Sequence, residues 1–177
     1  EIQEWIVKNL NDDSVIIEAG AASGTDTLWF SQTFPKGRIF AFEPLTVSFN
    51  RTLERIANCD NVEVYNVALG PTESTEELYV SSNKVSSSLL KPTGHIQFHP
   101  RVSFENKSTV RTINLDNFLK DQQVEQVDLM WLDMQGYEHT VLSHSSETLS
   151  KTRYLYSEVS LKEMYANSVL YNEFKSW

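Results

Sequence analysis

Two acidic residues and a turn of small residues near the start of the chain have the order of a nucleoside-binding unit. The apolar run Val15–Ile17 leads into Glu18, Gly20 and Gly24, and the next apolar run ends at Glu43. Glycines let a polar ligand approach the backbone closely, and a helix start offers free N–H groups. A carboxylate after the second strand can accept hydrogen bonds from both ribose hydroxyls. The segment therefore predicts a strand–turn–helix–strand unit that holds a nucleoside.

The spacing of this turn favours a ligand that carries a positive charge. Dinucleotide-binding enzymes use G-x-G-x-x-G, whereas here Glu18 precedes Gly20 and three residues separate Gly20 from Gly24. An acid at this place suits the ammonium group of S-adenosylmethionine better than a pyrophosphate, which disfavours an NAD-linked oxidoreductase. We expect Glu18 to face that ammonium group, directly or through water, and the turn to contact the cofactor through Gly20, Ala21, Ser23 and Gly24. Ordinary turn glycines and a structural strand-end acid are the open alternative.

Glu43 is the strongest single candidate for binding the ribose. A carboxylate can accept two hydroxyl hydrogen bonds in a fork, and Pro44 fixes the turn behind it. Asn66, Val67 and Ala68 follow the third expected strand, and we expect them to border the adenine, largely through backbone groups. A solvated strand-end acid is the alternative interpretation of Glu43.

Two further acids follow the last two expected strands. Asp133 ends the nearly continuous apolar run Val127–Leu132, which is typical of a central parallel strand, and Glu158 ends the next strand. Desolvation would raise the pKa of Asp133 enough for it to act as a general base on a hydroxyl. We expect Asp133 and Glu158 to be catalytic, although Asp133 could instead bind nearby loop amides. The pair could hold Mg²⁺ through oxygen ligands, but we do not favour a metal site.

A polar segment near the middle of the chain contains two histidines, His95 and His99. Their spacing is that of a ligand pair on a helix, but Gly94 and Pro100 make a helix there improbable. Loop histidines are usually surface residues. A mobile loop could nevertheless bring an imidazole close to an acceptor hydroxyl.

Hydrophobic periodicity predicts strands that alternate with helices along most of the chain. We expect core strands at 14–18, 38–43, 62–67, 127–133 and 153–159, and helices at 1–11, 24–33, 46–58, 115–120, 137–149 and 161–177. Two further strands, 76–81 and 110–113, interrupt the alternation with a polar loop between them. Right-handed crossovers place the carboxyl ends of parallel strands along one edge, where ligands bind. The pattern predicts an α/β domain over 1–177, with a mostly parallel sheet and helices on both faces.

Composition limits the partners. The chain of 177 residues is 40% hydrophobic and 22% charged, its net charge is −9, and no basic cluster is visible. Phosphate binding needs clustered Lys and Arg, so we expect no nucleic acid partner. No apolar run could span a membrane, and the single Cys59 fits a reducing compartment, so we expect a cytoplasmic location. The oligomeric state is left open.

Four segments resemble the FkbM-like family of S-adenosylmethionine-dependent methyltransferases between about Val15 and Val159. They are 18–28 (EAGAASGTDTL), 41–44 (AFEP) with 66–70 (NVALG), 86–89 (SSSL) with 112–119 (TINLDNFL), and 132–138 (LDMQGYE). The resemblance implies a class I, Rossmann-like methyltransferase fold with an inserted β-hairpin or lid between core strands three and four. It also implies O-methylation of a hydroxyl on a small molecule or glycan.

The sequence departs from that family pattern in three places. Ala22 stands where the family usually has Asn, and Gln135 where it usually has Glu. Class I methyltransferases normally continue into an antiparallel hairpin, which we do not find before Trp177. These departures keep a second hypothesis open, a non-catalytic nucleoside-binding or interaction module of the same fold.

Overall fold

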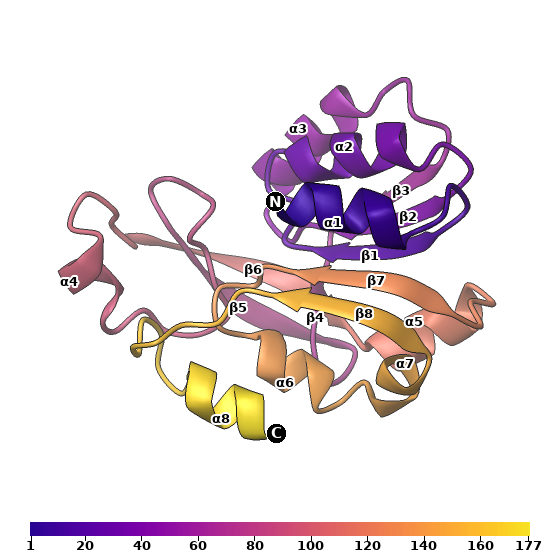
Figure 1. The fold of residues 1–177 in the computed structure, drawn as a ribbon. Coiled ribbons are helices and arrows are strands. Elements are labelled where there is room, and N and C mark those ends of the chain that lie inside the picture. The colour runs from indigo at the N-terminus through magenta and orange to yellow at the C-terminus, as the bar shows by residue number, and fades with distance from the viewer.

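The computed structural model describes all 177 residues and is built around a five-stranded parallel sheet (Figure 1). The strand order is β3-β2-β1-β7-β8. The chain adds strands on one side of β1 up to β3 and then crosses back to add β7 and β8 on the other side, so the strand order reverses between β1 and β7. This reversal is the switch point at which α/β sheets bind ligands. The bounds are β1 Val15–Ala19, β2 Arg38–Phe42, β3 Val62–Tyr65, β7 Val127–Leu132 and β8 Thr152–Ser157.

The central strands alternate between two hydrophobic cores, because successive side chains of a strand point to opposite faces. Ile16 packs with Phe30 in one cluster, whereas Ile17 packs with Leu119 in the other, and all four side chains are fully buried. Apolar side chains on both faces therefore explain why β1, β2 and β7 are nearly continuous hydrophobic runs.

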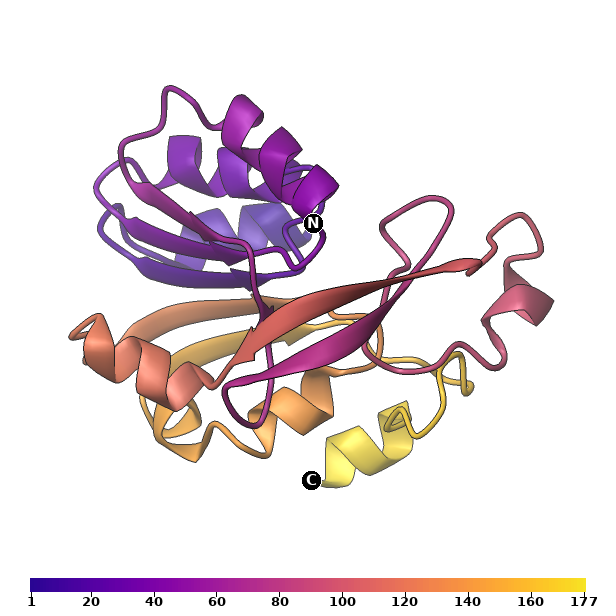
Figure 2. The same cartoon turned by 180° about the vertical axis from the view of Figure 1, so that it is seen from behind.

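Helices cover both faces of this sheet, as expected (Figures 1 and 2). One face carries α1, α2 and α3, and the other carries α5, α6 and α7. Asn114 caps α5, since its side-chain oxygen accepts a hydrogen bond from the Asn117 N–H. The bounds are α1 Ile2–Asn9, α2 Thr25–Thr33, α3 Thr46–Arg55, α5 Leu115–Asp121, α6 Glu138–Leu142 and α7 Ser146–Ser150.

The inserted hairpin is also present, and it belongs to a second, three-stranded sheet. β5 (Ser74–Val80) pairs antiparallel with β6 (Asn106–Ile113), and β4 (Ala68–Leu69) pairs parallel with β6 on its other side. Figure 2 shows the loop between β5 and β6 extending away from the main sheet. The fold is therefore the expected class I architecture with an insertion between its third and fourth core strands. That 1–177 forms one domain stays a prediction.

Three helix predictions were wrong. The expected helix 137–149 is divided into α6 and α7, and the Ser145 hydroxyl at the break bonds to the Val141 carbonyl, as serine does in competition with helix hydrogen bonds. The tail is helical only in α8 (Tyr171–Ser176), because residues before it pair with the insertion instead. A short helix, α4 (His95–Phe98), lies where we expected only loop.

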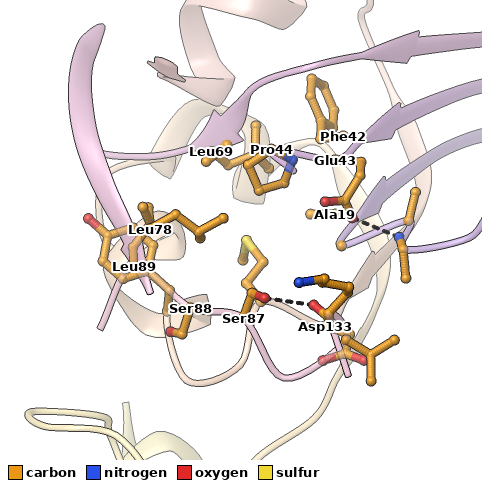
Figure 3. Close-up of a pocket in the computed structure, with 18 of the residues that line it drawn as sticks. Ala19, Phe42, Glu43, Pro44, Leu69, Leu78, Ser87, Ser88, Leu89 and Asp133 are labelled. Atoms are coloured by element: carbon orange, nitrogen blue, oxygen red, sulfur yellow. Dashed lines mark hydrogen bonds between the residues drawn. The ribbon is translucent and has the colours of Figure 1, made fainter. Parts of the chain in front are cut away.

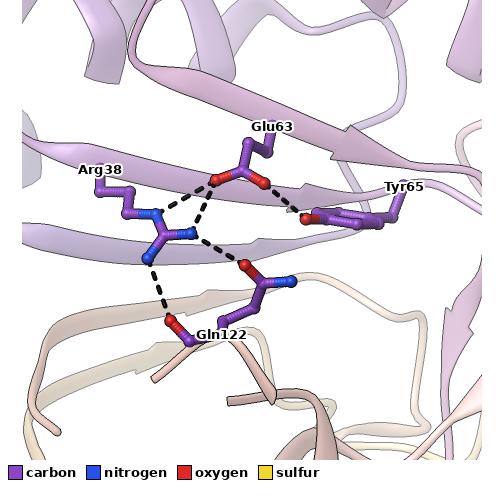
Figure 4. A network of polar contacts seen from close by, with 4 residues as sticks. All are labelled: Arg38, Glu63, Tyr65 and Gln122. Atoms are coloured by element: carbon purple, nitrogen blue, oxygen red, sulfur yellow. Dashed lines mark hydrogen bonds and ion pairs between the residues drawn. The ribbon is translucent and has the colours of Figure 1, made fainter. Parts of the chain in front are cut away.

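The amino-terminal end of β2 is held by a closed polar network (Figure 4). The Arg38 guanidinium donates to Glu63 Oε1 at 3.0 and 3.1 Å, and Glu63 Oε2 accepts from the Tyr65 hydroxyl at 2.7 Å. Arg38 also donates to the side chain and the carbonyl of Gln122, directly after α5. Because every charged group here has a partner, this end of the sheet is structural.

Candidate active site

The carboxyl-terminal ends of β1, β2 and β7 form one wall of a cavity, which we call the first cavity. Figure 3 shows Leu78 and Leu89 from the insertion on one side, with Ala19, Glu43 and Asp133 on the other. The switch point and the insertion together therefore enclose a site that neither could form alone. The lining comprises Ala19, Gly20, Ala21, Ala22, Ser23, Thr25, Asp26, Phe42, Glu43, Pro44, Val67, Ala68, Leu69, Leu78, Lys84, Val85, Ser87, Ser88, Leu89, Asp133, Met134 and Tyr137.

Glu43 connects the turns after β1 and β2. Its Oε2 accepts from the Ala22 N–H and its Oε1 accepts from the Leu45 N–H, both at 2.8 Å. The side chain is buried, and this burial raises its pKa to about 7 despite the two amide hydrogen bonds. A carboxylate oxygen has two lone pairs, so each oxygen can accept a further hydrogen bond from a ligand hydroxyl.

The turn after β1 adopts left-handed backbone conformations at three residues. Gly20 has φ +90°, Ala22 +50° and Gly24 +74°. A Cβ on Gly20 would lie 1.9 Å from the Asp133 carbonyl oxygen, so the turn lies directly against the end of β7. Only glycine allows both this close approach and this φ without strain. Gly20 therefore positions the cofactor-side turn against the candidate base.

Asp133 lines the first cavity directly after the end of β7. Burial and, secondly, the negative charge of Glu158 raise its pKa to about 6, although a 2.6 Å hydrogen bond from Gln135 Nε2 opposes the shift. A carboxylate with this pKa is largely deprotonated at neutral pH but is a better proton acceptor than an ordinary aspartate. The geometry therefore suits a general base.

The structure brings most of the predicted site residues together. Eight of them line the first cavity: Gly20, Ala21, Ser23, Glu43, Pro44, Val67, Ala68 and Asp133. The roles of these residues stay predictions, but their common position is what those roles require.

Four predicted residues, Glu18, Gly24, Asn66 and Glu158, are not part of the lining of this cavity, and their roles stay predictions. Glu18 is buried beneath the turn, where its Oε2 accepts from Thr27 Oγ1 at 2.6 Å, and burial raises its pKa to about 8. Gly24 packs against Thr52, and the Asn66 amide donates to the carbonyls of Glu43 and Pro44. These residues support the turns, because their polar or backbone groups are already occupied.

Glu158, the fourth residue, lines a different cavity, which we call the second cavity. It lies between the insertion, the start of α6 and the tail, and it encloses about 540 Å³. Glu158 still influences the first site through its charge, which raises the pKa of Asp133. The lining comprises Ser86, His95, His99, Gln135, Gly136, Glu138, His139, Glu158, Val159, Ser160, Met164, Tyr165, Ser168, Val169 and Phe174.

The sequence did not single out the apolar contribution of the insertion. Leu78 and Leu89 are 59–70 residues away from β1 in the chain, and only the folded hairpin brings them over the cavity. The serine segment 86–88 was recognised through the family pattern alone. Alternation along β5 buries Leu78 and Val80, and this alternation was the available signal.

The residues of the first cavity fit S-adenosylmethionine. Glu43 offers carboxylate lone pairs at the end of β2, where a ribose would bind. Val67, Leu69 and Leu78 offer apolar surface of the kind that covers an adenine, and Asp26 supplies a negative charge beside the turn. No group of three or more His, Cys, Asp or Glu side chains is arranged to hold a metal ion.

Comparison with known proteins identifies the family to which the chain belongs. Residues 18–177 match the model of the methyltransferase FkbM domain. The chain belongs to the FkbM methyltransferase family. The match covers both the strand ends around the first cavity and the insertion above it.

None of the helices combines the length and the apolar character that crossing a bilayer requires.

Individual relatives agree with this assignment. The 2-O-methyltransferase NoeI of Sinorhizobium fredii is 31% identical over 160 residues, which are 86% of this chain and 66% of NoeI. The hexuronic acid methyltransferase AglP of Haloferax volcanii is 21% identical over 90% of this chain and 61% of its own. The chain thus spans roughly three fifths to two thirds of the length of these relatives.

A solved structure supports the fold independently. The fibrillarin/Nop5p complex contains a chain that superposes on 94% of this one with a TM-score of 0.52 and 16% sequence identity, over 59% of its own length. At this identity the likeness concerns architecture alone.

Proposed function

We propose that this FkbM domain transfers a methyl group from S-adenosylmethionine to a hydroxyl of a small molecule or glycan. The observation that carries the proposal is the pair Glu43 and Asp133 on one cavity at the switch point. One carboxylate is anchored to two backbone amides, and the other has a raised pKa and is hydrogen-bonded to Gln135, which lines a second, polar cavity. Membership of a methyltransferase family and the names of NoeI and AglP support the same chemistry.

In this mechanism the protein positions the reactants and removes one proton. The bound sulfonium supplies an activated methyl group and a neutral thioether leaving group. Glu43 and the turn at Gly20 hold the nucleoside, and the apolar side chains around it exclude water. Asp133 would accept the proton of the acceptor hydroxyl, while S-adenosylmethionine, held by Glu43 and the turn at Gly20, would supply the methyl group and keep the bonding pair on its sulfur. The products are a methyl ether and S-adenosylhomocysteine.

Positioning accounts for much of the expected rate. In-line alignment of two bound reactants can lower a barrier by about 7–11 kcal/mol. The contact between Gly20 and the end of β7 provides that alignment, because it fixes the nucleoside turn relative to Asp133. General-base catalysis adds a smaller factor, typically about 10²–10⁴.

Two measurements test the proposal. Calorimetry with S-adenosylmethionine, S-adenosylhomocysteine and NAD should give binding of the first two alone. Transfer of a radiolabelled methyl group into a panel of sugars and hydroxylated metabolites should label at least one of them. Binding of NAD alone, or of none of the three, would exclude the proposed cofactor.

A non-catalytic binding module is the second candidate. The observation that favours it is the 2.6 Å hydrogen bond from Gln135 to Asp133, since this bond stabilises the carboxylate and lowers its basicity. Cofactor binding without labelling of any acceptor would support this candidate.

A cytoplasmic location stays a prediction.

A further inference from the structure

The chain makes a strained turn directly after the candidate base Asp133. Gln135 has φ +54°, in the left-handed region that residues with a side chain rarely adopt. Such strain persists only where neighbouring contacts fix the backbone, and it is concentrated at functional sites. The Ser88 hydroxyl donates to the Gln135 carbonyl at 2.9 Å, and a Cβ on Gly136 would lie 3.5 Å from the Tyr165 ring. The insertion and the tail therefore both hold this turn.

Gln135 is the residue whose side chain donates a hydrogen bond to Asp133, from Nε2 to Oδ1 at 2.6 Å. Four carboxylates and two tyrosines interact electrostatically with Asp133, namely Asp26, Glu43, Glu138, Glu158, Tyr156 and Tyr165. None of these groups is cationic, and Lys84 is the one basic residue that lines the first cavity. The Gln135 amide therefore opposes the rise in the pKa of Asp133 that burial and the neighbouring acids cause.

The hydroxyl of Tyr165 faces two acceptors but carries one hydrogen. Its oxygen lies 2.7 Å from the Ser86 carbonyl oxygen and 3.0 Å from Gln135 Oε1. Carbonyl and amide oxygens only accept hydrogen bonds, so the two acceptors must share that hydrogen. Burial, and then the charges of Asp133 and Glu138, raise the pKa of Tyr165, so the hydroxyl keeps its hydrogen. One acceptor is therefore short of a full hydrogen bond while Asp133 is charged.

Protonation of Asp133 removes this shortage. A carboxyl O–H can donate to Gln135 Oε1 once the amide has turned over, since the amide oxygen and NH₂ group have nearly the same shape. The NH₂ group then donates to the Tyr165 oxygen, and the Tyr165 hydroxyl donates to the Ser86 carbonyl alone. The protonated form thus contains one more complete hydrogen bond than the charged form.

We propose that Tyr165 is a positioning residue that favours proton uptake by Asp133 through the Gln135 amide. No proton leaves Tyr165, whose hydroxyl only rotates toward the Ser86 carbonyl. The same change strengthens the hydrogen bond between the tail and the insertion. The inference rests on the proposed methyl transfer for its catalytic meaning, because Asp133 takes up a proton there, but the hydrogen-bond linkage can be measured without turnover.

The first test is a titration of Asp133 in the whole 177-residue chain, followed by NMR of ¹³C-carboxyl-labelled aspartate. Tyr165→Phe keeps the buried ring but removes the hydroxyl. It should lower the Asp133 pKa by about 0.4–1, the equivalent of one net hydrogen bond. Tyr65→Phe is the matched control, since it also loses one hydroxyl hydrogen bond, to Glu63, but lies outside the lining of both cavities. It should leave the Asp133 pKa unchanged.

A second measurement needs no substitution. The carbonyl ¹³C signal of Ser86 should titrate with the same midpoint as Asp133, because the Tyr165 hydrogen turns toward this carbonyl when Asp133 is protonated. Tyr165→Phe should abolish that response. A Ser86 carbonyl signal that stays constant through the Asp133 titration of the unsubstituted chain would overturn the proposal.

A double-mutant cycle separates hydrogen bonding from entry of solvent. Gln135→Met keeps the length of the side chain but removes both polar groups. In that background Tyr165→Phe should leave the Asp133 pKa unchanged, because the connection through the amide is gone. An equal fall with and without Gln135 would mean that the loss of Tyr165 merely hydrates Asp133, and the proposal would be wrong.

Turnover distinguishes this inference from the proposed function. Where methyl transfer is measured, the acid limb of kcat should move to lower pH in Tyr165→Phe by the same amount as the Asp133 titration. Methyl transfer with an Asp133 pKa that Tyr165→Phe leaves unchanged would overturn the inference alone. The expected titrations without methylation of any acceptor would support the hydrogen-bond linkage, while the proposed methyl transfer would fail.

Discussion

The two cavities differ in how completely the fold satisfies their polar groups. In the first cavity, both oxygens of Glu43 accept backbone hydrogen bonds and Asp133 accepts one from Gln135. In the second, His95 and Ser168 each contain a buried atom without a partner. The first is therefore preorganised by the strand ends of the sheet, whereas the fold leaves two buried polar atoms around the second without a partner.

The origin of the two linings explains this difference. The first cavity takes its polar groups from strand ends whose positions are fixed by parallel pairing of β1 with β2 and β7. The second is formed by the insertion, the start of α6 and the tail, which contact one another through a few loop hydrogen bonds such as that of His95 N–H with the Met164 carbonyl.

The largest expected effect comes from breaking the preorganised cavity itself. Gly20→Ala would place a Cβ 1.9 Å from the Asp133 carbonyl oxygen at φ +90°, so the turn and β7 must separate. We expect the free energy of unfolding to fall by about 3 kcal/mol or more. Urea denaturation measures this change. Gly70→Ala is the control, since its Cβ would meet only Thr112 at 3.0 Å, and an equal loss in both variants would contradict the role of Gly20.

The next effect concerns cofactor affinity. Glu43→Gln replaces one carboxylate oxygen by an NH₂ group, which cannot accept a hydrogen bond. The hydrogen bond from the Ala22 or Leu45 N–H and one ribose contact are therefore both weakened. Loss of one charged hydrogen bond is worth about 1.5–3 kcal/mol, and the Kd for S-adenosylmethionine should rise at least about tenfold. Calorimetry measures it, and Glu63→Gln in the opposite-end network should leave the Kd unchanged. Retained affinity in Glu43→Gln would refute the ribose assignment.

A pH profile sharpens the comparison at the boundary between the cavities. Asp133 is a base only when deprotonated, so kcat should fall as the pH decreases through its pKa of about 6 and level off above it. Asp133→Asn should remove this limb and lower kcat about 100-fold, with little change in cofactor Kd. An unchanged kcat in Asp133→Asn would show that another residue is the general base.

The smallest effect on cofactor affinity is expected at Glu18, behind the first cavity. Its folded-state pKa of about 8 exceeds the ordinary 4.5, so the folded state binds the proton more tightly than the unfolded state. The free energy of unfolding should therefore decrease between about pH 4.5 and 8, and Glu18→Gln should flatten that decrease. Denaturation at several pH values measures it. Because the side chain does not line the cavity, cofactor Kd should change less than about threefold, within roughly 0.65 kcal/mol.

Local patterns in the sequence were sufficient to predict the sheet and most of the cofactor side. The apolar runs around Ile17, Phe40 and Met130 are buried on both faces, and Glu43 and Asp133 follow the strands that they were predicted to end. Strand ends are predictable because parallel pairing and right-handed crossovers bring them to one edge.

The predictions failed where distant segments meet. His95 was expected in a surface loop, but it is buried because the tail pairs with the insertion, as the bridge between Pro92 and Tyr165 shows. This contact leaves no periodic signal in the sequence.

The sequence by itself determined the order of strands and helices, the glycine turn and the acids at the strand ends, since these follow from local periodicity and backbone conformational preference. Only the tertiary structure decided which carboxylates face a cavity and which are buried as supports. It also decided that the insertion and the tail enclose a second polar cavity. Those outcomes depend on packing between segments far apart in the chain, where burial and hydrogen-bond partners, rather than residue type, determine what a side chain can do.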